Sequence, residues 1–166
     1  MDAARRSRTG EAATRFFFYG TLTHEHANPV TARVRSALGP PRRAFVRGQL
    51  HAVRTPDGWY PVLLTGGKNR VWGYLYTTGP DFDRRLLRLL DAYENYLPHH
   101  PAASEYVRKT ISVRPVPGTT SKAQAYVFMR KLTPAMRRVP GGDFARFLRD
   151  TGFAALSSGD EGASRR

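Results

Sequence analysis

Residues 16–22 read Phe16-Phe17-Phe18-Tyr19-Gly20-Thr21-Leu22, an apolar run that breaks abruptly at a glycine. A short, continuous run of aromatic residues predicts a buried strand, here ending at Tyr19. A strand that ends in glycine can turn sharply and leave successive backbone N–H groups pointing into a cavity. Such a nest binds a carboxylate or an oxyanion, although an ordinary strand-end turn has the same local sequence.

Five further strands are expected along the chain, two pairs of which are joined by turns at 56–58 and 117–118. They cover residues 45–53, 60–65, 71–77, 106–113 and 122–129. Several of these strands follow one another without a helix between them, which argues against a doubly wound parallel sheet.

Helices are expected at three places. Asn28 and Pro29 form a favourable N-cap and first turn, and a last helix begins near Asp143. The strongest helical pattern starts at Pro80-Asp81 and repeats apolar residues at helical spacing. The predicted fold class is therefore α+β, with a small mixed β-barrel or curled sheet of about six strands flanked by two to three helices.

The length of 166 residues fits one domain. A polar, Arg-rich leader is expected over 1–14, the folded domain over 15–154 and a disordered tail over 155–166. No secretory signal and no run of about 20 apolar residues is visible, so the cytoplasm is the default location. The chain has no cysteine, which excludes disulfides, thiolate zinc sites and thiol nucleophiles.

The chain is strongly basic, with 27 Lys and Arg residues against 13 Asp and Glu residues and a net charge of +14. Such a charge attracts polyanions and acidic ligands. The densest basic stretch, 33–54, holds six arginines and no acid, but elsewhere the basic residues are spread out. Nucleic acid is therefore expected to be an unlikely partner, and a solvated arginine-rich surface is the favoured interpretation.

Glu94 is a candidate for acid/base chemistry, since it follows the last core-facing position of the strongest helix. Most glutamates at helix ends are solvated. A carboxyl group that is partly desolvated there has its pKa raised toward neutrality and can act as a base and then as an acid. Asp91, one turn earlier, is expected to cap the helix or to pair with an arginine. The i, i+3 spacing of these two acids does not place them across a sugar, as a glycosidase requires.

Other kinds of site have little support. The pairs His24/His26 and His99/His100 suggest metal ligands, but no ordered metal-ligand spacing is present. No G-x-S-x-G, G-x-G-x-x-G or Walker pattern occurs either. No metal and no other cofactor is therefore expected.

Taken in chain order, several segments resemble the gamma-glutamylcyclotransferase-like (AIG2-like) family over roughly residues 16–149. They are Tyr19-Gly20-Thr21-Leu22, Gly48-x-Leu50, Tyr60-Pro61-Val62, Val71-Trp72-Gly73-Tyr74-Leu75-Tyr76, Leu90-Asp91-x-x-Glu94, Tyr106-x-Arg108, Ala125-Tyr126-Val127-Phe128 and Gly142-Asp143-Phe144. Each segment alone is a weak signal, and their common order makes the resemblance specific.

The resemblance implies an intramolecular aminolysis. The α-amine of a gamma-glutamyl group attacks its own side-chain carbonyl, closes 5-oxoproline and expels the amine of the amide. Glu94 would be the acid/base, and no metal or nucleophilic side chain is required. The loop of Tyr19, Gly20, Thr21 and Leu22 would hold the α-carboxylate or the oxyanion. Tyr106 and Tyr126 would line the pocket of this small-molecule substrate.

Two departures from the family lie beside Glu94. The family usually has glycine where this chain has Asn95, and the stretch 95–105 is rather long. Both bear on the substrate more than on the reaction. Two alternatives stay open: a relative that cleaves another amide or transfers an acyl group with the same glutamate, and a basic nucleic-acid or partner-binding module with a vestigial pocket. The leaving amine and the oligomeric state also stay open.

Overall fold

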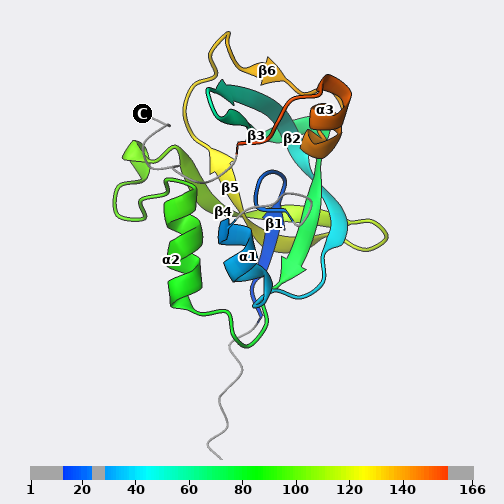
Figure 1. Ribbon diagram of the computed structural model, residues 1–166. Helices are drawn as coiled ribbons and strands as arrows, with labels where there is room; N and C mark the ends of the chain where they lie inside the picture. The colour runs from blue at the N-terminus through cyan, green and yellow to red at the C-terminus, as the bar shows by residue number, and fades with distance from the viewer. Residues whose placement is uncertain (1–12, 24–28, 157–166) are drawn as a thin grey trace, which may run out of the picture.

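The computed structural model describes residues 13–23 and 29–156 (Figure 1). Its elements are β1 (Arg15–Phe18), α1 (Pro29–Arg35), β2 (Arg42–Thr55), β3 (Gly58–Thr77), α2 (Arg84–Tyr93), the 3₁₀ helix η1 (Pro101–Ala103), β4 (Tyr106–Pro115), β5 (Ser121–Phe128), β6 (Arg137–Arg138) and α3 (Phe144–Thr151). Asn28, the expected cap of α1, lies outside the described residues.

Five strands close into a barrel in the order β3-β1-β5-β4-β2, because β2 also pairs with β3. The sixth strand, β6, adds to the free side of β2. The sheet is mixed, since β1 runs parallel to β5 while the other pairs are antiparallel. The predicted fold class, an α+β mixed barrel flanked by helices, is confirmed.

The run of three phenylalanines in β1 is explained by burial on both faces. Phe17 points into a core inside the barrel that continues to α3 through Phe144. Phe16 and Phe18 point to the opposite face, where α1 and α2 cover the barrel with residues such as Leu90. Adjacent residues of a strand point to opposite faces, so a strand buried on both sides is apolar throughout.

The two strands expected at 60–65 and 71–77 are one strand, β3. The expected break is present in the pairing, because the partners of β2 pass directly from Arg47↔Arg70 to Gly48↔Thr65. Residues 66–69 therefore form a large bulge, in which Gly66 has a left-handed φ of 99°. The polar sequence of 66–70 predicted the interruption correctly but not the continuity of the strand.

Helix α2 begins later than the sequence indicated. Its N-cap is Asp83 and not the Pro80-Asp81 pair, because the Asp83 carboxylate accepts hydrogen bonds from the backbone N–H groups of Arg85 and Leu86. Helix α3 begins at Phe144, next to the expected Asp143, which is its N-cap residue.

Residues at both ends of the described chain are tied to the barrel. The Thr14 carbonyl accepts a hydrogen bond from the Thr78 N–H at 2.8 Å. At the other end, Leu156 is buried and its N–H donates to the Trp59 carbonyl at 2.8 Å. No helix in the described part of the chain is both long enough and apolar enough to cross a membrane.

Candidate active site

The loop after β1 is a tight turn. Both the backbone N–H and the hydroxyl of Thr23 donate to the Gly20 carbonyl, at 3.0 and 2.9 Å. Gly20 does not have a positive φ. A Cβ placed on Gly20 would instead lie 2.2 Å from Cγ of Pro61 on β3. Glycine is therefore required here by the close approach of β3 rather than by a left-handed backbone.

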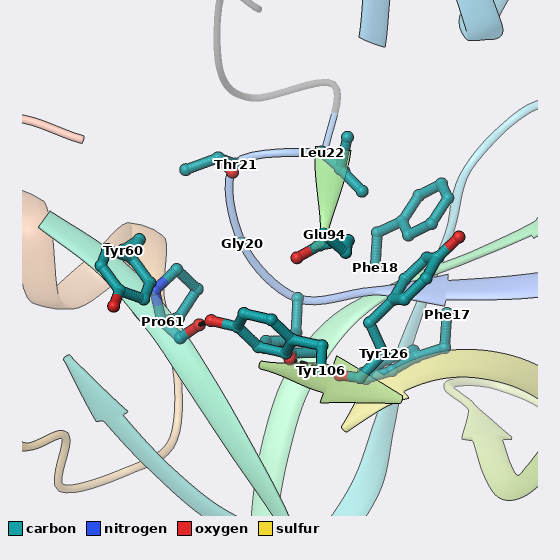
Figure 2. A pocket seen from close by; sticks show the side chains of 11 residues that line it. Phe17, Phe18, Gly20, Thr21, Leu22, Tyr60, Pro61, Glu94, Tyr106 and Tyr126 are labelled. Atoms are coloured by element: carbon teal, nitrogen blue, oxygen red, sulfur yellow. Dashed lines mark hydrogen bonds between the residues drawn. The ribbon is translucent and has the colours of Figure 1, made fainter. Parts of the chain in front are cut away.

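One cavity gathers all of the predicted site residues (Figure 2). They are Tyr19, Gly20, Thr21, Leu22, Glu94, Tyr106 and Tyr126. The remaining lining residues are Phe17 and Phe18 of β1 and Tyr60 and Pro61 of β3.

Glu94 stands at the end of α2 as its C-cap residue, and its backbone N–H donates to the Leu90 carbonyl at 3.1 Å. The burial of Leu90 and Tyr93 fixes this end of the helix against the barrel. The Tyr93 hydroxyl also shares a hydrogen bond of 2.7 Å with the Thr21 hydroxyl, which joins the helix end to the loop. Figure 2 shows the half-buried carboxyl group of Glu94 pointing into the cavity between that loop and Tyr106.

Asp91 lies behind the cavity in a hydrogen-bonded network. Its Oδ1 accepts from Nε of Arg108 at 2.9 Å and from the Tyr126 hydroxyl at 2.8 Å. The expected pairing of Asp91 with an arginine is thus present. Burial, followed by the negative charge of Asp91, raises the pKa of Tyr126 well above its ordinary value. Tyr126 therefore stays protonated, with its ring beside Glu94 and its hydroxyl held by Asp91 (Figure 2).

Two other tyrosines of the cavity are anchored in the same way. The Tyr106 hydroxyl donates to the Pro61 carbonyl at 2.8 Å, and the Tyr60 hydroxyl donates to Oε1 of Glu105 at 3.0 Å. Tyr19 is held by a bond from its hydroxyl to the Tyr126 carbonyl. The walls of the cavity are thus aromatic rings whose polar ends are fixed by protein acceptors, which makes the shape of the cavity rigid.

The family model described as gamma-glutamyl cyclotransferase, AIG2-like, matches residues 16–146. The chain belongs to this family. No curated protein sequence matches the chain significantly.

Solved structures similar to this AIG2-like chain include YkqA from Bacillus subtilis, at 18% identity and a TM-score of 0.58. The match covers 84% of this chain but 42% of YkqA, so the chain spans less than half the length of that protein. An AIG2-like protein from mouse is 23% identical over 74% of this chain and 80% of its own, with a TM-score of 0.52. A gamma-glutamyl cyclotransferase is 15% identical over 77% and 72%, with a TM-score of 0.50. These likenesses show the shared fold.

Asn95, which replaces the glycine usual in the AIG2-like family, has a left-handed φ of 50°. Asparagine is among the non-glycine residues that adopt this conformation most readily, so the substitution keeps the turn after Glu94. The turn is closed by Glu105, whose Oε2 accepts from Nδ2 of Asn95 at 3.5 Å and whose N–H donates to the Asn95 carbonyl at 3.4 Å.

Sequence reasoning did not assign to this AIG2-like site the lining residues Phe17, Phe18, Tyr60 and Pro61, or the buried Glu105 that holds Tyr60. Tyr60 and Pro61 stand in a segment that carried the family resemblance, so a signal existed for them. Glu105 is a single acid before a strand, and no local pattern marks it.

The long stretch 95–105, which departs from the family pattern, contributes no residue to the lining of the cavity. Neither Tyr96 nor His99 nor His100 lines the cavity. The two histidines are exposed, and Tyr96 packs under the Arg108 guanidinium at 5.8 Å. His24 and His26 lie outside the described residues.

Proposed function

We propose that this chain is a gamma-glutamylcyclotransferase that releases an amine from a gamma-glutamyl amide and forms 5-oxoproline, with Glu94 as the general acid/base. The observation that carries the proposal is the carboxyl group of Glu94, which enters the cavity beside the 19–22 loop. A single carboxyl group in such a place is sufficient for this reaction, because both partners of the attack belong to one molecule.

The proposed steps move one proton in and out of Glu94. The substrate α-ammonium group first gives one proton to water, and the free amine nitrogen attacks the side-chain amide carbon. The Glu94 carboxylate takes the second proton, which this nitrogen must lose as the ring forms. The resulting oxyanion, or the substrate α-carboxylate, is held by backbone N–H groups of the loop around Gly20. Glu94 then gives its proton to the leaving nitrogen as the C–N bond breaks, and the ring amide of 5-oxoproline remains.

The charges around the cavity favour an amine substrate. Among the described residues, the buried acids are Asp91 and Glu105, and both hold tyrosines of this cavity. Glu94 adds a third carboxyl group, whereas Arg108 compensates Asp91. In an otherwise strongly basic chain, such a group of acids stabilises a cationic ammonium group.

The proposal is tested with a set of gamma-glutamyl substrates that differ in the amine they release. The set contains gamma-glutamyl amino acids, glutathione, a lysine-linked isopeptide and gamma-glutamyl derivatives of small alkyl amines. Each is incubated with the protein, and 5-oxoproline and the free amine are measured by mass spectrometry. The proposal predicts both products in equal amounts from at least one substrate. Release of the amine without 5-oxoproline would instead favour the related amide-cleaving enzyme, and no product from any substrate would contradict the proposal.

A further inference from the structure

A second hollow region lies away from the Glu94 cavity, where the β2–β3 hairpin, β6 and α3 meet (Figure 1). It consists of two hollows of about 650 and 470 Å³ that share Trp72 and the segment 138–141 as a common wall. We call it the arginine groove, after its basic lining residues Arg43, Arg70, Arg137, Arg138 and Arg146. It has no lining residue in common with the Glu94 cavity.

The arginines of the groove outnumber its acids. The acids are Asp143, which pairs with Arg43, and Asp150, which pairs with Arg146 at 3.5 Å. The three other arginines, Arg70, Arg137 and Arg138, form no ion pair within the described part of the chain. The groove therefore carries an excess of positive charge that an anion can neutralise.

Strand register creates this surface from residues that are far apart in the sequence. The pairs Arg43↔Tyr74, Phe45↔Trp72 and Arg47↔Arg70 lie across β2 and β3. Because alternate residues share a face, all six project from the same side of the hairpin. The basic residues that are spread along the chain are thus gathered by folding.

Several of these guanidinium groups are held on aromatic rings. Arg43 lies between Trp72 and Tyr74, at 5.1 Å from each ring centre, and Arg70 lies 4.6 Å from the centre of Phe45. Arg137 lies over Phe147 and Phe153, at 5.7 Å from each. A guanidinium group whose face lies on an aromatic ring still has N–H groups at its edge that can donate to a phosphate. Because the ring already holds the arginine side chain in place, the side chain loses less conformational entropy when a phosphate binds.

The exposed arginines of α2 provide a contrast. Arg84, Arg85 and Arg88 are equally basic and exposed, but none of them lies over a ring in the described structure. In Figure 1, α2 lies on the other side of the barrel from α3. The groove therefore differs from an ordinary solvated basic surface.

We propose that the arginine groove binds single-stranded nucleic acid, with phosphates on Arg70, Arg137 and Arg138 and a base against Trp72. Trp72 is half-buried and lines both hollows, so a strand that follows the arginines passes over an aromatic side chain. Stacking of bases on aromatic residues within a positively charged groove is the general mode of single-strand binding. Trp72 already contacts Arg43 and Phe45, and its exposed part is left for a base; an acidic peptide would satisfy the arginines but has no ring to place there.

The test is fluorescence anisotropy with a labelled oligo-dT and a labelled oligo-U of about 16 nucleotides, long enough for known single-strand sites. If three phosphate contacts form, binding falls by roughly 20-fold between about 50 and 200 mM salt. The charge reversal R137E/R138E should weaken binding by at least tenfold at low salt and reduce that salt effect to about threefold. The control R84E/R85E carries the same change in net charge on α2 and should weaken binding by less than about threefold.

Tryptophan fluorescence and amine release distinguish specific binding in the groove from general attraction to a basic protein. In a Trp59→Phe background, Trp72 is the remaining tryptophan of the chain, and its fluorescence should be quenched by the oligonucleotides but not by polyglutamate. Amine release at the Glu94 cavity should be unchanged in R137E/R138E. Absence of binding at low salt would overturn the proposal. Equal losses in the two charge-reversed proteins, or equal affinity for polyglutamate, would overturn it as well.

Discussion

At the scale of single residues, the neighbouring acids Asp91 and Glu94 have different surroundings. Asp91 is buried against Arg108 and Tyr126, whereas Glu94 enters the cavity. Asp91→Asn removes the charge that compensates a partly buried arginine and should lower the free energy of unfolding by about 1–3 kcal/mol. Turnover of the folded variant should fall far less than in Glu94→Gln. Urea unfolding and 5-oxoproline assays measure the two effects.

The control for this prediction is Asp150→Asn, which breaks the exposed pair with Arg146. An exposed i, i+4 pair contributes little, so its loss should stay within about 0.5 kcal/mol. If Asp91→Asn abolished turnover as completely as Glu94→Gln, a mechanism with two carboxylates would have to replace the present one.

His51 is a second residue with a measurable signature. It is buried on β2, its Nδ1 has no hydrogen-bond partner in the described structure, and burial followed by the charge of Arg138 lowers its pKa below the ordinary 6.5. The folded protein thus binds this proton less readily than the unfolded chain does. Its contribution to stability is complete above about pH 6.5 and is lost as the pH falls toward the lowered value.

His51→Gln should therefore flatten the loss of stability between about pH 7 and 5. Urea unfolding of the wild type and the variant at several pH values measures this. Parallel curves for the two proteins would show that His51 does not titrate in the expected way.

At the scale of structural elements, the site depends on how closely β1 approaches β3. Gly20→Ala places a Cβ on Cγ of Pro61 and should disturb both the loop and β3. Forced close contacts of this kind cost about 1–3 kcal/mol. Substrate binding should weaken too, because the 19–22 loop would move. Gly20→Val, which is larger, should have a stronger effect.

The double variant Gly20→Ala/Pro61→Ala removes the Cγ and Cδ atoms that the new Cβ meets. It should recover most of the stability lost in Gly20→Ala. A double variant as unstable as the single one would mean that Gly20 is required for its backbone conformation, and not for the contact with Pro61.

The elements also show which features the sequence could predict. Apolar runs located β1, β4 and β5, because burial of both faces or of alternate residues leaves a clear pattern. The two-residue β6 has no apolar pattern, since both residues are exposed arginines that only pair with β2. The start of α2 was placed too early, at Pro80-Asp81, because an aspartate stands at both 81 and 83 and the sequence alone does not distinguish which one caps the helix.

The residues that line the cavity were predictable where they belong to segments that resemble the family. Glu94 and the 19–22 loop follow from such segments and from their positions at element ends. Glu105 could not be predicted, because its role depends on Tyr60 and Asn95, which reach it through tertiary structure. The arginine groove likewise depends on the register of β2 and β3, which no local pattern reveals.

At the scale of the whole molecule, the net charge of +14 should assist the encounter with substrate more than the chemistry. A gamma-glutamyl substrate carries an α-carboxylate, which the overall field attracts. Salt at about 0.15 M limits this attraction to roughly 8 Å. Raising the salt should therefore increase KM modestly and leave kcat nearly unchanged. Steady-state rates at low and high salt test this, and a large fall in kcat would contradict it.

The acid/base role of Glu94 is tested most directly by single-turnover formation of 5-oxoproline. The rates of the wild-type protein and of Glu94→Gln are compared with the best substrate. The substitution keeps the shape of the side chain but removes the proton carrier. We expect Glu94→Gln to unfold at the same temperature as the wild type and to form 5-oxoproline at least about 100-fold more slowly. A folded Glu94→Gln protein with wild-type rates would contradict the role of Glu94 as the acid/base.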